Sequence, residues 1–180
     1  MALDRSAQYQ ALAEWLNQRE WRIFGTLKFA DGSLIPEQQA ERSLKIFFNK
    51  LDRLYFGSNL VRSGQRIERI TFRHLGTSGE NLHYHFIANP PGNVAKFCDN
   101  AKHIWGNLDY STLSQGETRV EPIGTSTRAA TYGLHEYWRN GADLIHLPTT
   151  HISSSHIEPA SMPKMRRLLK QEDLNQSRIY

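Results

Sequence analysis

The chain has 180 residues, of which 39% are hydrophobic and 11% aromatic, enough for one packed domain over residues 1–180. Its net charge of +4 suits a polyanionic partner without requiring one. The single cysteine, Cys98, excludes an intramolecular disulfide framework and a cysteine-based zinc cluster. No apolar run approaches the roughly 20 residues that span a bilayer, and the first ten residues lack the apolar core of a signal peptide. We therefore expect a cytoplasmic protein with no membrane partner.

Hydrophobic spacing divides the chain into alternating helices and strands. In chain order we expect a helix over 6–20, a strand over 21–29, a helix from Pro36 to just before Gly57, strands over 67–75 and 82–88, a helix over 93–105, strands over 109–113 and 117–123, a helix over 126–140 and a basic amphipathic helix over about 159–172. This order predicts an α+β fold with a central antiparallel sheet of about five strands. We expect helices packed on one face of the sheet and the active site on the open face.

Two histidines lie two residues apart on the strand over 82–88. Because side chains alternate along a strand, His83 and His85 point to the same face, while Leu82, Tyr84 and Phe86 point into the core. Neutral imidazoles on a rigid strand can converge on one divalent metal ion. A His-x-His pair by itself is more often a pair of polar residues on a solvated face, so a metal site needs a third ligand.

The preceding strand offers this third ligand. If the turn is centred between Ser78 and Gly79, residues whose numbers sum to 157 face each other, which places His74 opposite His83 and on the same face. A register shift of one residue would turn His74 away and leave Glu80, in the turn, as the alternative ligand. A third interpretation is that His74 is a solvated residue at the end of its strand.

The helix over 126–140 has two unlike stripes. The polar stripe contains Tyr132, His135, Glu136 and Arg139, and the apolar stripe contains Ala130, Leu134, Tyr137, Trp138 and Gly141. We therefore expect Tyr137 to be buried beside Trp138 and Tyr132 to be accessible to a ligand. On an isolated helix, Tyr132 would be interpreted as an ordinary surface tyrosine.

Three segments in order resemble the motifs of one superfamily: 25–29 (GTLKF) on the first strand, 81–86 (NLHYHF) with the histidine pair, and 119–123 (RVEPI) followed by 129–136 (AATYGLHE). Residues 21–140 resemble the HUH endonucleases, specifically the single-tyrosine Rep proteins that initiate rolling-circle replication of plasmids and of single-stranded DNA phages and viruses. The fold of these proteins is RRM-like. Similar proteins carry a Tyr-x-x-Lys pattern. Here Tyr132 matches the tyrosine, but His135 stands in place of the lysine.

The resemblance implies sequence-specific nicking and rejoining of single-stranded DNA, at an origin or hairpin, through a covalent 5′-phosphotyrosine. Tyr132 is the implied nucleophile, with His135 as a second catalytic residue, and the implied ligands of a Mn²⁺ or Mg²⁺ ion are His83, His85 and His74. The family more often has an acidic or polar residue near the third ligand position, and an imidazole there favours manganese over magnesium. The sequence contains no Walker-type loop, so we expect a helicase to act in trans. We also expect the protein to be a monomer.

Phosphate contacts need basic side chains near the site. The candidates are Lys28, Arg73, Arg139, Lys164, Arg166, Arg167 and Lys170.

Three alternative functions stay open: a transposase or relaxase of the same superfamily, a Rep-like protein that binds DNA without cutting it, and a non-catalytic nucleic-acid-binding module. The last is disfavoured because the strands lack the alternating aromatic pairs of an RNP motif.

Overall fold

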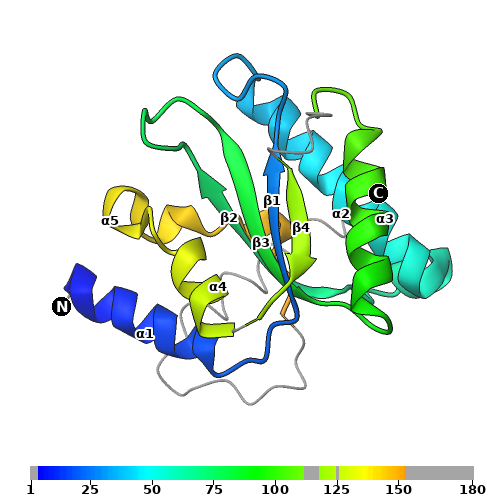
Figure 1. Ribbon diagram of the computed structural model, residues 1–180, viewed down its shortest axis with the longest axis horizontal. Coiled ribbons are helices and arrows are strands. Elements are labelled where there is room, and N and C mark those ends of the chain that lie inside the picture. The colour runs from blue at the N-terminus through cyan, green and yellow to red at the C-terminus, as the bar shows by residue number, and fades with distance from the viewer. Residues whose placement is uncertain (1–3, 112–117, 125, 153–180) are drawn as a thin grey trace.

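The computed structural model describes residues 4–111, 118–124 and 126–152. Four strands form one antiparallel sheet in the order β2-β3-β1-β4 (Figure 1). They are β1 (Ile23–Lys28), β2 (Glu68–His74), β3 (His83–Asn89) and β4 (Arg119–Pro122). The predicted α+β class with an antiparallel sheet is confirmed.

The predicted count of about five strands is wrong. The segment expected to form a strand over 109–113 contributes a single bridge between Phe29 and Ser111, and residues 112–117 lie outside the described part of the chain. Tyr110 has a left-handed φ of 68°, which interrupts the extended backbone that a strand needs. Turn-type hydrogen bonds, such as Ser111 N–H to the Leu108 carbonyl, replace ladder bonds there.

Five α-helices are described: α1 (Arg5–Asn17), α2 (Glu37–Arg62), α3 (Val94–Gly106), α4 (Ser126–Gly133) and α5 (Tyr137–Asn140). Two 3₁₀ turns, Gly141–Leu144 and Leu147–Thr149, follow them. Gly57 ends the regular first part of α2 as predicted, because its φ of 76° is left-handed, and a short helical segment continues beyond it. The predicted basic helix over 159–172 lies outside the described residues.

Helices cover both faces of the sheet (Figure 1). Helices α2 and α3 pack on one face through residues such as Phe47 and Trp105, while α1 and the α4–α5 region pack on the other through Leu16 and Leu134. The expectation of one covered and one open face was therefore wrong. The reason is that β2 and β3 also carry apolar residues on their second face, such as Phe72, and these must be buried as well.

One half of the second face remains accessible. Along β1, Phe24, Thr26 and Lys28 are only half-buried, and their neighbours on β4, Arg119 and Glu121, are exposed. We call these five residues the β1–β4 strip. The strip lies beside the part of the sheet that α1 and α4 cover, so a ligand has access to the second face from this side.

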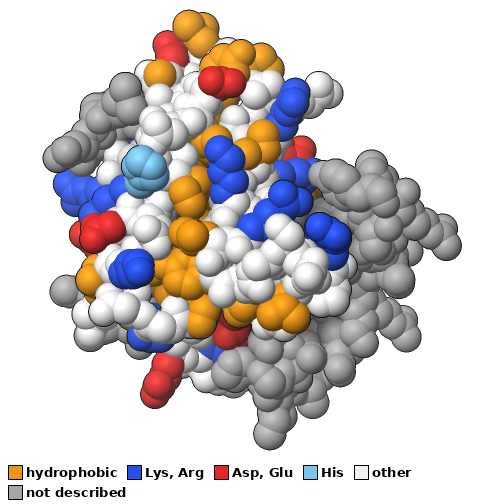
Figure 2. Space-filling model, turned by 90° about the vertical axis from the view of Figure 1, so that its right-hand side faces the viewer, with side chains coloured by type: hydrophobic (Ala, Val, Ile, Leu, Met, Phe, Trp, Pro, Cys, Tyr) orange, Lys and Arg blue, Asp and Glu red, His pale blue; other side chains and the backbone are white. Residues whose placement is uncertain are grey.

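The opposite side of the molecule has a mixed surface. Figure 2 looks onto the α2–α3 side and shows Lys and Arg side chains interspersed with apolar ones. The exposed apolar residues of α2 include Ile46, Leu54 and Leu60. No helix within the described ranges is long and apolar enough to cross a membrane.

Candidate metal centre

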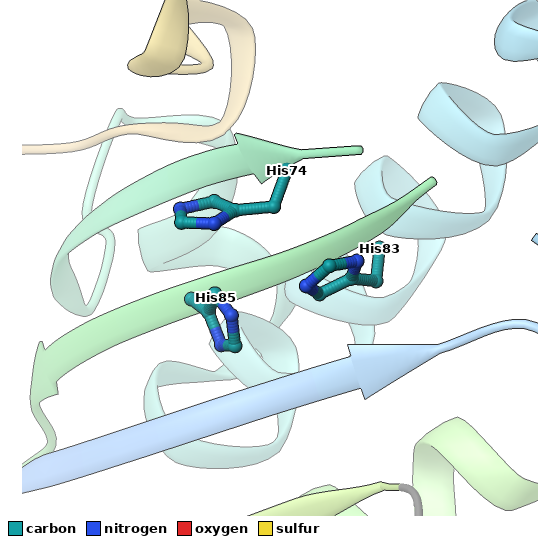
Figure 3. Close-up of side chains that lie close together, drawn as sticks. All are labelled: His74, His83 and His85. Atoms are coloured by element: carbon teal, nitrogen blue, oxygen red, sulfur yellow. The ribbon is translucent and has the colours of Figure 1, made fainter. Parts of the chain in front are cut away.

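The β2–β3 hairpin brings three histidines together. The ladder pairs His74 with His83, as the predicted register required, and pairs Phe72 with His85. Ring centroids are 4.5 Å apart for His74 and His85, 4.9 Å for His83 and His85, and 5.5 Å for His74 and His83. Figure 3 shows all three rings on the same side of the two strands. We call these residues the histidine triad.

The triad is buried: His74 is 0% exposed, His83 is 7% exposed and His85 is 2% exposed. Burial penalises the charged imidazolium, and it lowers the pKa of His74 to about 4 and that of His85 to about 2. Burial also lowers the pKa of His83. All three rings are therefore neutral at pH 7, which is the form that ligates metals.

Hydrogen bonds fix which ring nitrogens carry protons. His83 Nδ1 lies 2.8 Å from the Asn81 carbonyl oxygen, and His74 Nε2 lies 3.0 Å from the Gly133 carbonyl oxygen. Because a carbonyl oxygen only accepts, each of these nitrogens is the N–H donor, and the other nitrogen of each ring keeps a free lone pair. His85 Nδ1 lies 2.9 Å from Thr26 Oγ1, which leaves Nε2 as the remaining ligand atom of that ring.

Two of these remaining nitrogens, His74 Nδ1 and His85 Nε2, are buried and have no hydrogen-bond partner among the described residues. A buried polar atom without a partner costs about 1–3 kcal/mol. Each residue of the triad offers one ligand atom within 4.8 Å of the others. Oriented neutral imidazoles of this kind suit a divalent transition ion, and the backbone acceptors behind them are the usual second layer of such a site. The triad could therefore hold a metal ion.

Glu80, the alternative third ligand, does not join the triad. It is exposed, and it belongs to neither group of potential metal ligands found among the described residues. The register that puts His74 opposite His83 leaves Glu80 in the turn between the strands. Two turn glycines support this register, because Gly76 and Gly79 have left-handed φ values of 68° and 80° and are joined by a hydrogen bond.

Tyr132 stands at the boundary between the triad and the β1–β4 strip. The residue is 54% exposed, yet its ring lies 5.2 Å from that of His85 and 5.5 Å from that of Phe24. The His135 ring is 4.9 Å away, and His135 Nδ1 contacts the Tyr132 carbonyl oxygen at 2.6 Å. The prediction that Tyr132 is accessible is confirmed, and the structure places it beside the triad.

The predicted helix over 126–140 is broken, and this changes its apolar stripe. Gly133 is buried with the Phe72 ring where its side chain would be, and turn-type bonds replace helical ones from Leu134 onward. Tyr137 is 2% exposed, as predicted. Trp138 is 53% exposed and stacks on Tyr9, so its predicted burial was wrong because the break shifts the phase of the helix.

Glu136 makes contacts that the sequence does not predict. Its carboxylate accepts hydrogen bonds from the backbone N–H groups of Leu75 and Gly76, and Oε1 lies 3.5 Å from His74 Nδ1. Burial would raise the pKa of Glu136, but these N–H groups and the nearby imidazoles lower it below its usual value. Its only sequence signal is its place on the same helical stripe as Tyr132. His74, His135 and Glu136 form a second group of potential metal ligands.

The predicted DNA-contacting residues are scattered. Lys28 pairs with His83 in the ladder and shares the face of the triad. Arg139 is exposed and donates to the Gly76 carbonyl oxygen. Arg73 pairs with Tyr84, so it points to the other face of the sheet, where its Nε lies 2.7 Å from Glu37. Because side chains alternate along β2, Arg73 does not share the face of the triad, and its contact with DNA stays a prediction.

The four basic residues of the C-terminal segment lie outside the described residues: Lys164, Arg166, Arg167 and Lys170. The structure adds Arg119 of the β1–β4 strip, which was not among the predicted DNA-contacting residues.

The chain was compared with protein-family models, with curated proteins and with solved structures. None of the three comparisons gave a match.

Proposed function

We propose that this protein is a metal-dependent, single-strand DNA nicking and rejoining enzyme of the HUH type, acting as a Rep protein in rolling-circle replication. One observation carries the proposal: an accessible tyrosine, Tyr132, lies with its ring 5.2 Å from His85 of a buried histidine triad. Attack of a tyrosine on a metal-activated phosphate requires the tyrosine to lie close to the ligands of the metal.

The chemistry divides between the triad and the tyrosine. A divalent ion held by His74, His83 and His85 would polarise the scissile phosphate and stabilise its developing charge. Tyr132 Oη forms a bond to phosphorus as the bond between phosphorus and the 3′ oxygen breaks. The phenolic proton ends on the departing 3′ oxygen, which leaves a 3′-hydroxyl and a 5′-phosphotyrosine. Since the new link is also a phosphate ester, the reverse reaction rejoins the strand.

His135 is suited to moving this proton or to orienting the phosphate. It is exposed, it follows Tyr132 by three residues in the turn after α4, and its Nε2 is 3.7 Å from Glu136 Oε1. With Nδ1 directed at the Tyr132 carbonyl oxygen, Nε2 is the nitrogen available for proton transfer.

The β1–β4 strip offers a path for single-stranded DNA. Arg119 and Lys28 supply positive charge for phosphates, and the rings of Phe24 and Tyr132 offer surfaces on which unpaired bases can stack. Glu121, also on the strip, opposes binding of phosphates and limits how closely the backbone can run along the far end of β4.

The test is a search for a covalent protein–DNA product. The full chain is incubated with Mn²⁺ and a diverse pool of single-stranded oligonucleotides and is then separated on a denaturing gel. We expect a slowly migrating adduct that Tyr132→Phe abolishes. Tyr110→Phe is the matched control, because Tyr110 is equally exposed, at 53%, and should keep the adduct.

No adduct from the wild-type chain across the pool, or an undiminished adduct with Tyr132→Phe, would refute the proposal. Retained DNA binding without any adduct would favour the non-catalytic nucleic-acid-binding alternative. A dimer that forms the adduct would favour a transposase, since those enzymes share active sites between subunits; a mass measurement in solution distinguishes the two.

A further inference from the structure

A second set of potential ligands lies beside the end of α4. His74, His135 and Glu136 each offer one ligand atom, and these atoms lie within 4.8 Å of one another. Glu136 Oε1 is 3.5 Å from His74 Nδ1 and 3.7 Å from His135 Nε2. The ring centroids of His74 and His135 are 4.4 Å apart, closer than any two rings of the triad. We call these three residues the second ligand group.

Hydrogen bonds direct one lone pair of each residue into this group. His74 Nε2 donates to the Gly133 carbonyl oxygen at 3.0 Å, and His135 Nδ1 donates to the Tyr132 carbonyl oxygen at 2.6 Å. In the neutral rings, His74 Nδ1 and His135 Nε2 therefore carry lone pairs. His74 Nδ1 is buried and has no hydrogen-bond partner among the described residues, which marks it as an atom in need of a ligand.

The separations in the second ligand group match those of ligand atoms around one ion. Metal–ligand bonds of about 2.1 Å that meet at a tetrahedral angle put two ligand atoms about 3.4 Å apart. Glu136 Oε1 accepts one N–H, from Gly76, so it keeps a lone pair for a metal. His135 is exposed, so an ion can enter the group from solvent and a water molecule can complete its coordination.

We infer that His74, His135 and Glu136 form a second metal site, separate from the histidine triad, that takes Zn²⁺. Two imidazoles, one carboxylate and a water molecule are a known tetrahedral ligand set for Zn²⁺. A given set of nitrogen and oxygen ligands binds Zn²⁺ more tightly than Mn²⁺, so Zn²⁺ is the ion assigned to this half-open site. The ligand atom of His74 is Nδ1 in both sites, because Nε2 donates to Gly133. The two sites therefore cannot be filled at the same time.

Sharing His74 makes the second site inhibitory, a consequence that rests on the proposed function. An ion held by the second ligand group withdraws His74 from the triad. It also occupies His135 Nε2, the nitrogen available for proton transfer beside Tyr132. The binding of Zn²⁺ itself does not depend on the proposed function and can be measured without DNA.

The test measures Zn²⁺ binding when the triad is incomplete. The full chain carrying His85→Leu, which leaves two triad imidazoles, is titrated with Zn²⁺ by calorimetry. We expect one Zn²⁺ per chain, bound at least about 100-fold more weakly when His135→Asn is added, because losing a ligand costs more than the roughly 10–100-fold lost with a supporting group. His103→Asn is the matched control, since His103 is an exposed histidine on α3, and should bind Zn²⁺ like its parent.

A His85→Leu chain that does not bind Zn²⁺, or that binds it equally well with His135→Asn, would refute the second site. These results leave the proposed function untouched, because its adduct test uses Mn²⁺ and the wild-type chain. Circular dichroism checks that His85→Leu is folded; His83→Ala replaces it as the parent if it is not.

The position of the ion gives an independent readout. Crystals of the same parent variant are grown with Zn²⁺, and the ion is located by anomalous scattering. We expect His135 Nε2 and Glu136 Oε1 at about 2.0–2.2 Å from the ion. An ion with either atom more than about 3 Å away would overturn the inference.

Discussion

Replacing His85 by leucine should leave the metal-free protein about as stable as the wild type or more stable, while removing its stabilisation by Mn²⁺. The substitution removes the buried Nε2, which has no described hydrogen-bond partner, and this relieves a cost of about 1–3 kcal/mol. It also removes the bond from Nδ1 to Thr26, which contributes about 0.5–1.5 kcal/mol. Leucine is apolar and similar in volume, so the two terms give a net change between about 0.5 kcal/mol of destabilisation and about 2.5 kcal/mol of stabilisation.

Mn²⁺ should reverse this order of stability. An ion present at 100 times its Kd stabilises the folded protein by about 2.7 kcal/mol. For a chain of this length, about 2–4 °C of Tm per kcal/mol corresponds to an increase of about 5–11 °C in the wild type and to none in His85→Leu. Differential scanning calorimetry at pH 8, with EDTA and then with Mn²⁺, measures both effects.

The control for this prediction is His103→Leu, which changes an exposed histidine on α3 and should keep the full Mn²⁺ shift. A His85→Leu protein that loses more than about 2 kcal/mol in EDTA and still gains stability from Mn²⁺ would show that the buried lone pair is not a metal ligand. The buried, neutral rings of the triad would then not be the metal site.

Two further predictions concern the fold. A Cβ at Gly25 would lie 2.0 Å from the Phe86 ring, so Gly25→Ala should destabilise the protein by about 1–3 kcal/mol in urea unfolding, whereas Gly124→Ala, with no described atom within 4 Å of its Cβ, should change stability little. Equal stabilities would contradict the close packing on β1. Burial lowers the pKa of His146 and His151 to about 4. In EDTA, the free energy of unfolding should therefore keep its full value above pH 6.5. Between pH 6.5 and pH 4 it should fall by about 1.4 kcal/mol per pH unit for each histidine. The sign follows because the unfolded chain binds more protons in this window; a flat profile from pH 6.5 to 4.5 would refute it.

The histidine triad was predictable because it depends on local rules. Strand alternation put His83 and His85 on one face, and a short turn between two strands fixed the partner of His83 as His74. Helical periodicity separated Tyr132 from Tyr137 because those positions come before or close to the break in the helix.

The remaining features depend on contacts between distant segments. The helix breaks where Gly133 meets the Phe72 ring, and the turn after it directs Glu136 to the amides of the hairpin, 60 residues earlier in the chain. Helical periodicity describes one element at a time, so it cannot predict a carboxylate recruited by another element. The covering of the second face could not be predicted from periodicity either. It depends on α1 and α4, which are distant in the chain, packing together over β2 and β3.

The partial covering of the second face affects the proposed reaction. A fully open face would expose the triad to water, and its imidazoles would titrate near their ordinary range. Here α4 keeps His85 2% exposed while Tyr132, on the same helix, stays 54% exposed beside the β1–β4 strip. Under the proposed function, this arrangement puts the metal ligands in a low-dielectric environment, where the charge on the phosphate is stabilised most strongly, and leaves the nucleophile where a flexible DNA strand can reach it. The same helix therefore provides both the burial of the metal ligands and the access to the tyrosine.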